Sequence, residues 1–308
     1  MTTVQLPAGD TVWAPLQRLS GLRAWLGRTS TLLGDPSVPL VLTLVLVMLA
    51  TSQRWYVAVP TVVLGTVGVV APGLRSSARF WFALAAVLGA AAWADRWQID
   101  NHQFLIAYWC LAVGVAAQGP DPERVRRISA RLLVGFVFLL ATTWKLLAPD
   151  FVDGSFMRYT LLTDSRFSEV ATLVGGIDSQ DLAANQDALR VLDDPGAAPA
   201  AVPLRSTGRL DGVAMALTWW TLAIEGAVAV LFLAPWRRIG RHRDVALIAF
   251  VLTTYAVAPV VGVGWILVCL GLAQREPARR FLPLAYVGTF LAVQLFTAPW
   301  TSLAGVAA

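Results

Sequence analysis

The chain has few charged residues for its length. Aspartate, glutamate, lysine and arginine make up 14% of its 308 residues, whereas they make up about a quarter of a soluble domain. Hydrophobic residues make up 57%, and the mean hydropathy is +0.64. This composition excludes an ordinary soluble domain and indicates a protein that crosses a membrane several times. At about twenty residues a span, the length allows about seven to nine spans.

Cysteine is scarce, and several well-known site motifs are absent. The two cysteines, Cys110 and Cys269, fall within apolar stretches, and the longest hydrophilic loop has none. The sequence therefore implies no disulfide framework. It also lacks a metal-spaced cluster of cysteine and histidine, a phosphate-binding glycine loop and a Gly-x-Ser-x-Gly elbow, so we predict no metal and no nucleotide. The N-terminus lacks the pattern of a cleaved signal peptide, and we expect the first span to be an uncleaved anchor.

The positive charge is concentrated in short segments between apolar runs. A net charge of +5 would suit a nucleic-acid partner in a soluble protein, but here the positive-inside rule explains the arginines. We therefore expect membrane lipids as partners and no nucleic acid. The segment 119–127 is the clearest cytoplasmic loop, and four spans before it place the N-terminus in the cytoplasm too. The sequence predicts a multi-pass integral protein of a bacterial-type plasma membrane.

The expected organisation is one helical bundle with polar ends. Residues 1–36 form a cytoplasmic N-terminal segment, in which the apolar side chains of 11–28 recur at helical spacing, as in a helix lying in the membrane interface. A solvated tail is the alternative. Residues 37–300 form the bundle, and 301–308 a C-terminal tail. The clearer spans are expected at about 37–53, 55–72, 79–97, 103–118, 130–148, 212–235 and 282–299.

A long polar segment, 149–211, interrupts the bundle. It contains ten acidic residues and five arginines, so the charge bias places it outside the cell. It is too long to be a simple connector, and 178–194 has helical spacing that ends at a Pro-Gly pair. We predict a partly helical extracytoplasmic loop over the outer mouth of an all-α transmembrane bundle.

The apolar run 245–273 has two interpretations. As one long helix it would place the arginines that follow it outside, against the charge rule. A break at Pro259, Gly262 and Gly264 allows two short helices that return to the cytoplasmic side. We favour the broken pair, because irregular backbone is tolerated at membrane depth where protein buries it.

Lys145 is the first candidate for chemistry, because it is the one charge in the apolar run 132–147. His102 begins the fourth span and Lys145 nearly ends the fifth, so antiparallel packing predicts that both lie at one depth near the outer face. A lysine acts as a base only when neutral, which costs roughly 4 kcal/mol at neutral pH, and burial can supply this much. Histidine can hold a substrate oxygen or move a proton. The alternatives are a lysine that extends to the headgroups and a solvated or capping histidine.

Glu225 is the second candidate, because it lies near the middle of the sixth span. A charge there costs about 2.5–3.5 kcal/mol. We expect its carboxyl group to be protonated, paired with a cation or in contact with water. A structural hydrogen bond to a neighbouring helix is the plain alternative.

Three short motifs resemble a known family. The stretch 100–105, which precedes an apolar run, is similar to an Asn-His-aromatic-aromatic-Leu stretch of the HTTM-domain family. The segments 144–146 and 150–154 resemble its lysine-leucine and aspartate-aromatic-x-x-glycine motifs, and Glu225 resembles a glutamate that opens a later helix. This family is the membrane module shared with vitamin K-dependent gamma-glutamyl carboxylase. The resemblance touches roughly residues 80 to 275.

The resemblance implies an enzyme of the carboxylase and quinol epoxidase type. Lys145 would be the base that deprotonates a reduced quinone of the vitamin K or menaquinol type. Asn101 and His102 would act near the quinone or its oxyanion, and Trp144 and Glu225 would complete the binding site. A glutamyl-protein substrate is not supported, because the chain ends soon after its last span and lacks the large exported domain of the carboxylase.

Two other classes of function stay open from the sequence. One is a transporter or lipid-binding membrane protein that uses Glu225 and the break from Pro259 to Gly264. The other is a non-catalytic membrane scaffold whose functional surface is the acidic outer loop.

Overall fold

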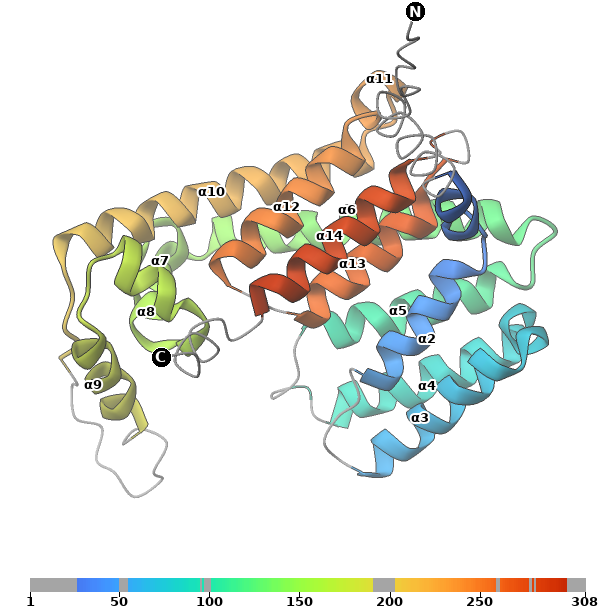
Figure 1. Ribbon diagram of the computed structural model, residues 1–308, viewed down its shortest axis with the longest axis horizontal. Helices are drawn as coiled ribbons and strands as arrows, with labels where there is room; N and C mark the ends of the chain where they lie inside the picture. The colour runs from blue at the N-terminus through green and yellow to red at the C-terminus, as the bar shows by residue number, and fades with distance from the viewer. Residues whose placement is uncertain are drawn as a thin grey trace, which may run out of the picture.

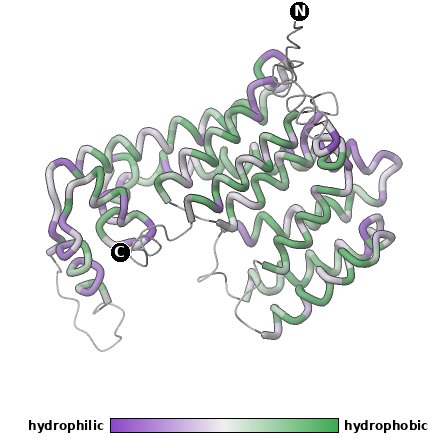
Figure 2. The backbone as a smooth tube through the Cα atoms, in the orientation of Figure 1, coloured by the Kyte–Doolittle hydropathy of each residue, from purple (hydrophilic) through white to green (hydrophobic). Residues whose placement is uncertain are grey.

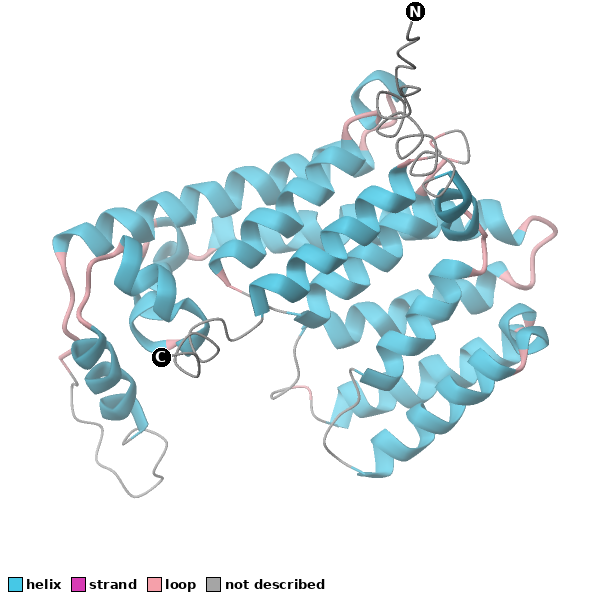
Figure 3. Cartoon of the chain, in the orientation of Figure 1, coloured by secondary structure: helices cyan, strands magenta, loops and turns pink. Residues whose placement is uncertain are grey.

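The predicted all-α fold class is confirmed by a computed structural model. The structure describes residues 27–49, 55–94, 96, 101–190, 203–258, 261–276, 279 and 281–297, and the regular elements in these ranges are all helices (Figure 3). Most of the predicted interfacial helix at 11–28 and the tail at 301–308 lie outside the described residues. So does Pro259 of the predicted helix break.

Nine of the described helices form one bundle, in which α10 and α3 lie at opposite edges (Figure 1). They are α2 (Val38–Leu49), α3 (Trp55–Val70), α4 (Ala78–Ala94), α5 (Asn101–Ala116), α6 (Pro122–Leu147), α10 (Gly208–Leu233), α12 (Arg243–Val257), α13 (Val261–Gln274) and α14 (Leu282–Thr297). A 3-10 turn, η1 (Pro72–Ser76), joins α3 to α4, and α11 (Arg237–Gly240) precedes α12.

The segment between α6 and α10 forms a separate outer region, which lies beside the first half of α10 (Figure 1). Its elements are α7 (Pro149–Val152), α8 (Ser155–Thr163), η2 (Ser165–Phe167), a π-helical turn η3 (Val170–Val174) and α9 (Ser179–Arg190). The helix predicted within 178–194 corresponds to α9. The predicted long loop is therefore largely helical.

Only some of these helices are long and apolar enough to cross a membrane. Among the described residues these are α6 and α10, at 26 residues each, and a third if Gly27–Leu33 and α2, bent by 69°, count as one span. The other apolar helices have 17 residues or fewer, shorter than the roughly twenty that a crossing usually needs. The structure thus supports two or three spans, and the predicted seven to nine are not confirmed. Hydrophobic residues nevertheless run along most helices of the bundle (Figure 2).

The arginines of the predicted loop 119–127 lie in the first turns of α6, so this part of the segment is helical. Asp121 caps the helix by accepting a hydrogen bond from the backbone N–H of Arg124 at 3.0 Å, and Pro122 occupies the first turn. Both residues favour a helix start. As a result, α6 begins eight residues before the predicted span at 130.

The broken pair predicted for 245–273 is confirmed. Helix α12 ends at Val257 and α13 begins at Val261. The side chain of Gln274, the last residue of α13, donates to Asp244 in the first turn of α12, so both lie at one end of the bundle. Since Arg243, Arg275 and Arg279 lie there with Arg126, we call it the arginine-rich end.

Two hydrophobic cores meet along α10. The second half of this helix, with Val228, Ala229 and Phe232, belongs to the bundle core. Its first half, with Leu210, Ala214 and Leu222, belongs to a core formed by the outer region. Glu225 lies between Leu222 and Val228, and therefore at the junction of the two cores.

Candidate functional site

Lys145 and Glu225 form an ion pair between α6 and α10. The Nζ of Lys145 donates a hydrogen bond to Oε1 of Glu225. The helices are antiparallel, because Gly135 of α6 faces Leu233 of α10 while Lys145, ten residues later, faces Glu225, eight residues earlier. A side chain at Gly135 would collide with Leu233, so glycine there lets the helices approach closely. The lysine thus points into the protein, toward a residue that the sequence singled out separately.

The pair is largely buried but open on the lysine side. The side chain of Glu225 is 9% exposed and that of Lys145 is 24% exposed. The Nζ also lies 5.4 Å from the centroid of the Phe151 ring, within the range of a cation–π interaction. Phe151 is a member of the outer core. The amine therefore contacts both the bundle and the outer region.

One oxygen of the glutamate has no hydrogen-bond partner among the described residues. Oε2 of Glu225 is buried, and the buried hydroxyls of Thr142 on α6 and Thr218 on α10 share this property. Thr142 precedes Lys145 by one turn, and Thr218 precedes Glu225 by two turns, so each shares a helix face with its neighbour. An unsatisfied buried polar group costs about 1–3 kcal/mol. Such groups in a native protein call for an explanation, of which a ligand or an ordered water is one.

His102 is buried at the first turn of α5 and packs against α13. Its imidazole lies against Gly262, where a Cβ atom would collide with the ring. This close approach explains why α13 has a glycine at this position. Asn101, the preceding residue, is exposed. The structure therefore gives His102 a packing contact and places Asn101 at the surface.

The histidine and Lys145 nevertheless lie at about the same level along the bundle. Phe138 of α6 stacks edge-on against Phe250 of α12, with ring centroids 4.6 Å apart. Lys145 is seven residues beyond this contact, about 10 Å at 1.5 Å per residue. Tyr255 is five residues beyond it on α12, and its hydroxyl accepts a hydrogen bond from the backbone N–H of Gly264. Gly262, which touches His102, is two residues nearer the break than Gly264. The histidine therefore also lies about 10 Å beyond the contact between Phe138 and Phe250.

Trp144 does not take part in the pair. Its side chain is 76% exposed, because successive residues of a helix point about 100° apart and Lys145 faces α10. The structure therefore does not place Trp144 in the pair, and its predicted substrate-binding role stays a prediction. Of the five residues predicted for the site, the structure brings Lys145 and Glu225 together.

A second buried carboxylate was missed from the sequence. Asp244, 2% exposed, accepts hydrogen bonds from the side chain of Gln274, from the Tyr286 hydroxyl at 2.9 Å and from Arg279 at 2.9 Å. It therefore joins α12, α13 and α14 at the arginine-rich end. An acidic residue in an arginine-rich segment next to an apolar run was the signal that could have revealed it.

Carboxylates of the outer region are held by local hydrogen bonds. A hydrogen bond from the Arg166 side chain lowers the pKa of Asp164, and the backbone N–H of Ser155 lowers the pKa of Asp153. Both aspartates lie at the starts of short helical segments, where such bonds are common. These groups are structural and stay ionised near neutral pH.

The fold defines an all-helical protein with two or three helices that could cross a membrane, and its described residues contain no cluster of three metal-binding side chains. No known protein family, curated protein or solved structure matches the chain. The family resemblance therefore rests on the short sequence motifs alone.

Proposed function

We propose that the chain is a multi-pass membrane enzyme in which the Lys145–Glu225 pair takes a proton from a hydroxyl group of a membrane-dissolved reduced quinone. The observation that carries this proposal is the buried ion pair with one unpaired carboxylate oxygen. Ionisable residues at membrane depth are costly and are usually functional. The substrate class comes from the sequence resemblance to the carboxylase module.

The pair has the charge balance that such a proton transfer needs. With the lysine protonated and the glutamate ionised, the pair has no net charge. When Oε2 of Glu225 accepts the proton of a neutral hydroxyl, the negative charge left on the substrate oxygen lies beside the Lys145 ammonium group. The site stays neutral overall, which matters because an uncompensated charge is expensive in a low-dielectric environment. The pair as a unit is then the base, and Lys145 holds the resulting anion.

The groups around the pair offer chemistry that suits a flat, largely apolar molecule with hydroxyl groups. Oε2 of Glu225 offers a hydrogen-bond acceptor, and the ring of Phe151 offers an aromatic surface next to the amine. A bound reduced quinone would supply the acidic hydroxyl and the reducing electrons. In this proposal Asn101, His102 and Trp144 have no direct part, because the first and last are exposed and the histidine packs against Gly262.

A transport path through the α12–α13 break has less support. Gly262 and Gly264 are in close contact with the His102 and Tyr255 rings, so these side chains fill the described part of the break. A path there would need both rings to move. The pairing of Glu225 with Lys145 likewise directs the glutamate toward α6.

The test is quinol epoxidation by the purified protein in detergent. Reduced vitamin K or menaquinol is supplied with oxygen, and the epoxide is measured by mass spectrometry, with water as the other product. Lys145→Ala and Glu225→Gln should each lower the rate by about 100-fold or more, the range for a lost acid–base group. Trp144→Phe, next to the lysine but exposed, should retain activity.

Two results would overturn the proposal. One is an equal rate in the wild type and Lys145→Ala. The other is the absence of product from the folded wild-type protein with either quinol, which would favour a transporter or a scaffold.

A further inference from the structure

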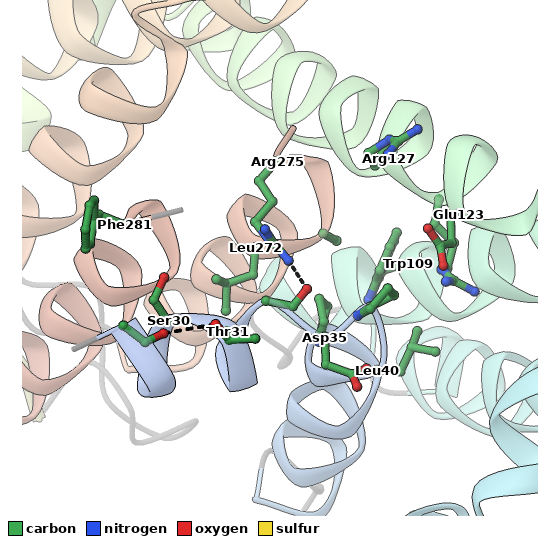
Figure 4. A pocket seen from close by; sticks show the side chains of 16 residues that line it. Ser30, Thr31, Asp35, Leu40, Trp109, Glu123, Arg127, Leu272, Arg275 and Phe281 are labelled. Atoms are coloured by element: carbon green, nitrogen blue, oxygen red, sulfur yellow. Dashed lines mark hydrogen bonds between the residues drawn. The ribbon is translucent and has the colours of Figure 1, made fainter. Parts of the chain in front are cut away.

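A cavity of about 850 Å³ lies at the arginine-rich end. Its walls come from the helix Gly27–Leu33, the turn and first residues of α2, one residue of α5, the start of α6, and the end of α13 with the segment after it (Figure 4). Along α6, the cavity is about 28 Å from Lys145, at 1.5 Å per residue. It is therefore distinct from the ion pair.

Three arginines and two acids line this cavity. Arg126 and Arg127 come from the start of α6, and Arg275 follows α13. The acids are Asp35, in the turn before α2, and Glu123 on α6 (Figure 4). Three positive and two negative charges leave a net charge of +1 on the lining.

The two acidic residues of the lining differ in whether they interact with an arginine of the cavity. The carboxylate of Asp35 accepts a hydrogen bond from the backbone N–H of Ser37 at 2.7 Å and thereby stabilises the turn before α2. Glu123 lies close enough to Arg126 to interact with it electrostatically. Among the described residues, neither carboxylate forms an ion pair with the guanidinium group of Arg127 or Arg275.

Arg275 is held in place from the other side of the cavity. One terminal nitrogen of its guanidinium donates to the backbone carbonyl of Gly34, as the dashed line in Figure 4 shows. Burial lowers the pKa of Arg275. A guanidinium group has five N–H donors in a fixed fork, so one bond to Gly34 fixes its orientation and leaves other donors.

The remaining lining is apolar. Leu40, Leu272 and Phe281 line the cavity, together with Trp109 of α5 (Figure 4). The indole N–H of Trp109 donates to the Thr43 hydroxyl at 2.9 Å, which fixes the orientation of this buried ring in the cavity wall. The cavity therefore combines cationic donors with apolar walls.

We propose that this cavity binds a phosphate ester, with its charged oxygens on Arg126, Arg127 and Arg275 and its carbon part against the apolar residues. Arginine is suited to phosphate because its planar fork matches two phosphate oxygens. Basic pockets between helices on the cytoplasmic side are typical sites for anionic lipid headgroups. The same chemistry fits a soluble phosphate ester, and the two sources differ in how they reach the protein.

The experiment measures ligand binding to the purified full chain in neutral detergent by native mass spectrometry. The ligands are phosphatidylglycerol, phosphatidylcholine and glycerol 3-phosphate, each titrated separately. Arg126→Gln is the first variant, since it leaves the Arg275 bond to Gly34 intact. Arg124→Gln, an exposed arginine in the same helical turn that does not line the cavity, is the matched control for charge.

We expect phosphatidylglycerol to bind more tightly than phosphatidylcholine, and Arg126→Gln to weaken its binding roughly 5- to 10-fold. Arg124→Gln should change it less than twofold. Ala273→Phe, which places an aromatic ring in the cavity lining without changing charge, should also weaken binding. Competition by glycerol 3-phosphate at equal affinity would assign the site to a soluble ester instead of a lipid.

The proposal is overturned if neither phosphatidylglycerol nor glycerol 3-phosphate binds, or if Arg124→Gln weakens binding as much as Arg126→Gln. It is also overturned if Ala273→Phe leaves binding unchanged. A melting temperature for each variant separates lost binding from lost folding.

Discussion

Two buried carboxylates of this protein are held in contrasting ways. Asp244 accepts hydrogen bonds from three side chains on three segments. Glu225 has one partner, Lys145, and its second oxygen has none among the described residues. A fully bonded buried polar group rigidifies the structure around it, whereas a partly bonded one is available to another molecule. The contrast indicates a structural role for Asp244, whereas the unpaired oxygen of Glu225 is the basis of the proposed proton transfer.

The largest expected effect is the loss of stability when Asp244 is replaced. Asp244→Ala would leave Gln274 and Tyr286 without their buried acceptor and Arg279 without its partner. We expect a loss of about 3–5 kcal/mol of stability, as when one member of a buried ion pair is removed. Denaturant titration in mixed micelles measures this loss. A loss below about 1 kcal/mol would show that the network does not hold α12, α13 and α14 together.

Replacing both members of the Lys145–Glu225 pair should cost less stability than replacing one. Lys145→Met alone leaves a buried carboxylate and should cost about 3 kcal/mol, whereas Lys145→Met with Glu225→Leu should come within about 1 kcal/mol of the wild type. The double variant should still lack epoxidase activity. A double variant as unstable as the single one would mean that the pair is needed for folding, and would remove the contrast with Asp244.

Removal of single hydroxyl groups tests the comparison further. One belongs to Tyr286, which is bonded to Asp244, and the other to Thr218, which is on the same helix as Glu225. Tyr286→Phe removes a bond to a charged group and should cost about 1.5–3 kcal/mol. Thr218→Val replaces a buried hydroxyl that has no partner among the described residues, and should be neutral or stabilising by up to about 1 kcal/mol. The same titration compares them. Equal destabilisation by both variants would argue that Thr218 has a hydrogen-bond partner in solution, such as water.

The smallest effect is expected at the surface. Because the Arg166 side chain lowers the pKa of Asp164, the stabilisation by this carboxylate is present above its unfolded pKa of about 3.9 and is lost as pH falls through the lower folded value. Asp164→Asn should therefore cost about 0.5 kcal/mol or less at pH 7, and less at pH 2, where the carboxyl group is closer to protonation. A difference that persists undiminished at pH 2 would contradict an electrostatic origin.

The positions of individual candidates could be predicted from the sequence, but their pairing could not. Lys145 and Glu225 each stood out as a charge in an apolar run. Which residue of α10 faces Lys145 depends on the stagger of the two helices, and the long segment between them does not determine it. The stagger is set by Gly135 against Leu233 on one side and by the outer core on the other.

Other differences have similarly local causes. The basic segment at 124–127 was interpreted as a loop because of its charge, whereas the Asp121 cap and Pro122 extend α6 through it. Antiparallel order predicted that His102 and Lys145 share one level, but the contact of His102 with Gly262 depends on α13, which is far away in the sequence. Asp244 was missed because its partners come from three later segments.

The sequence by itself determined the helical class and the identity of the costly charges, and it favoured the break between α12 and α13, because these depend on composition, periodicity and local charge. The tertiary structure alone decided that Lys145 faces Glu225, that Asp244 is fully bonded and that three arginines share a cavity. These features depend on the relative placement of helices, which arises from side-chain packing between residues distant in the chain.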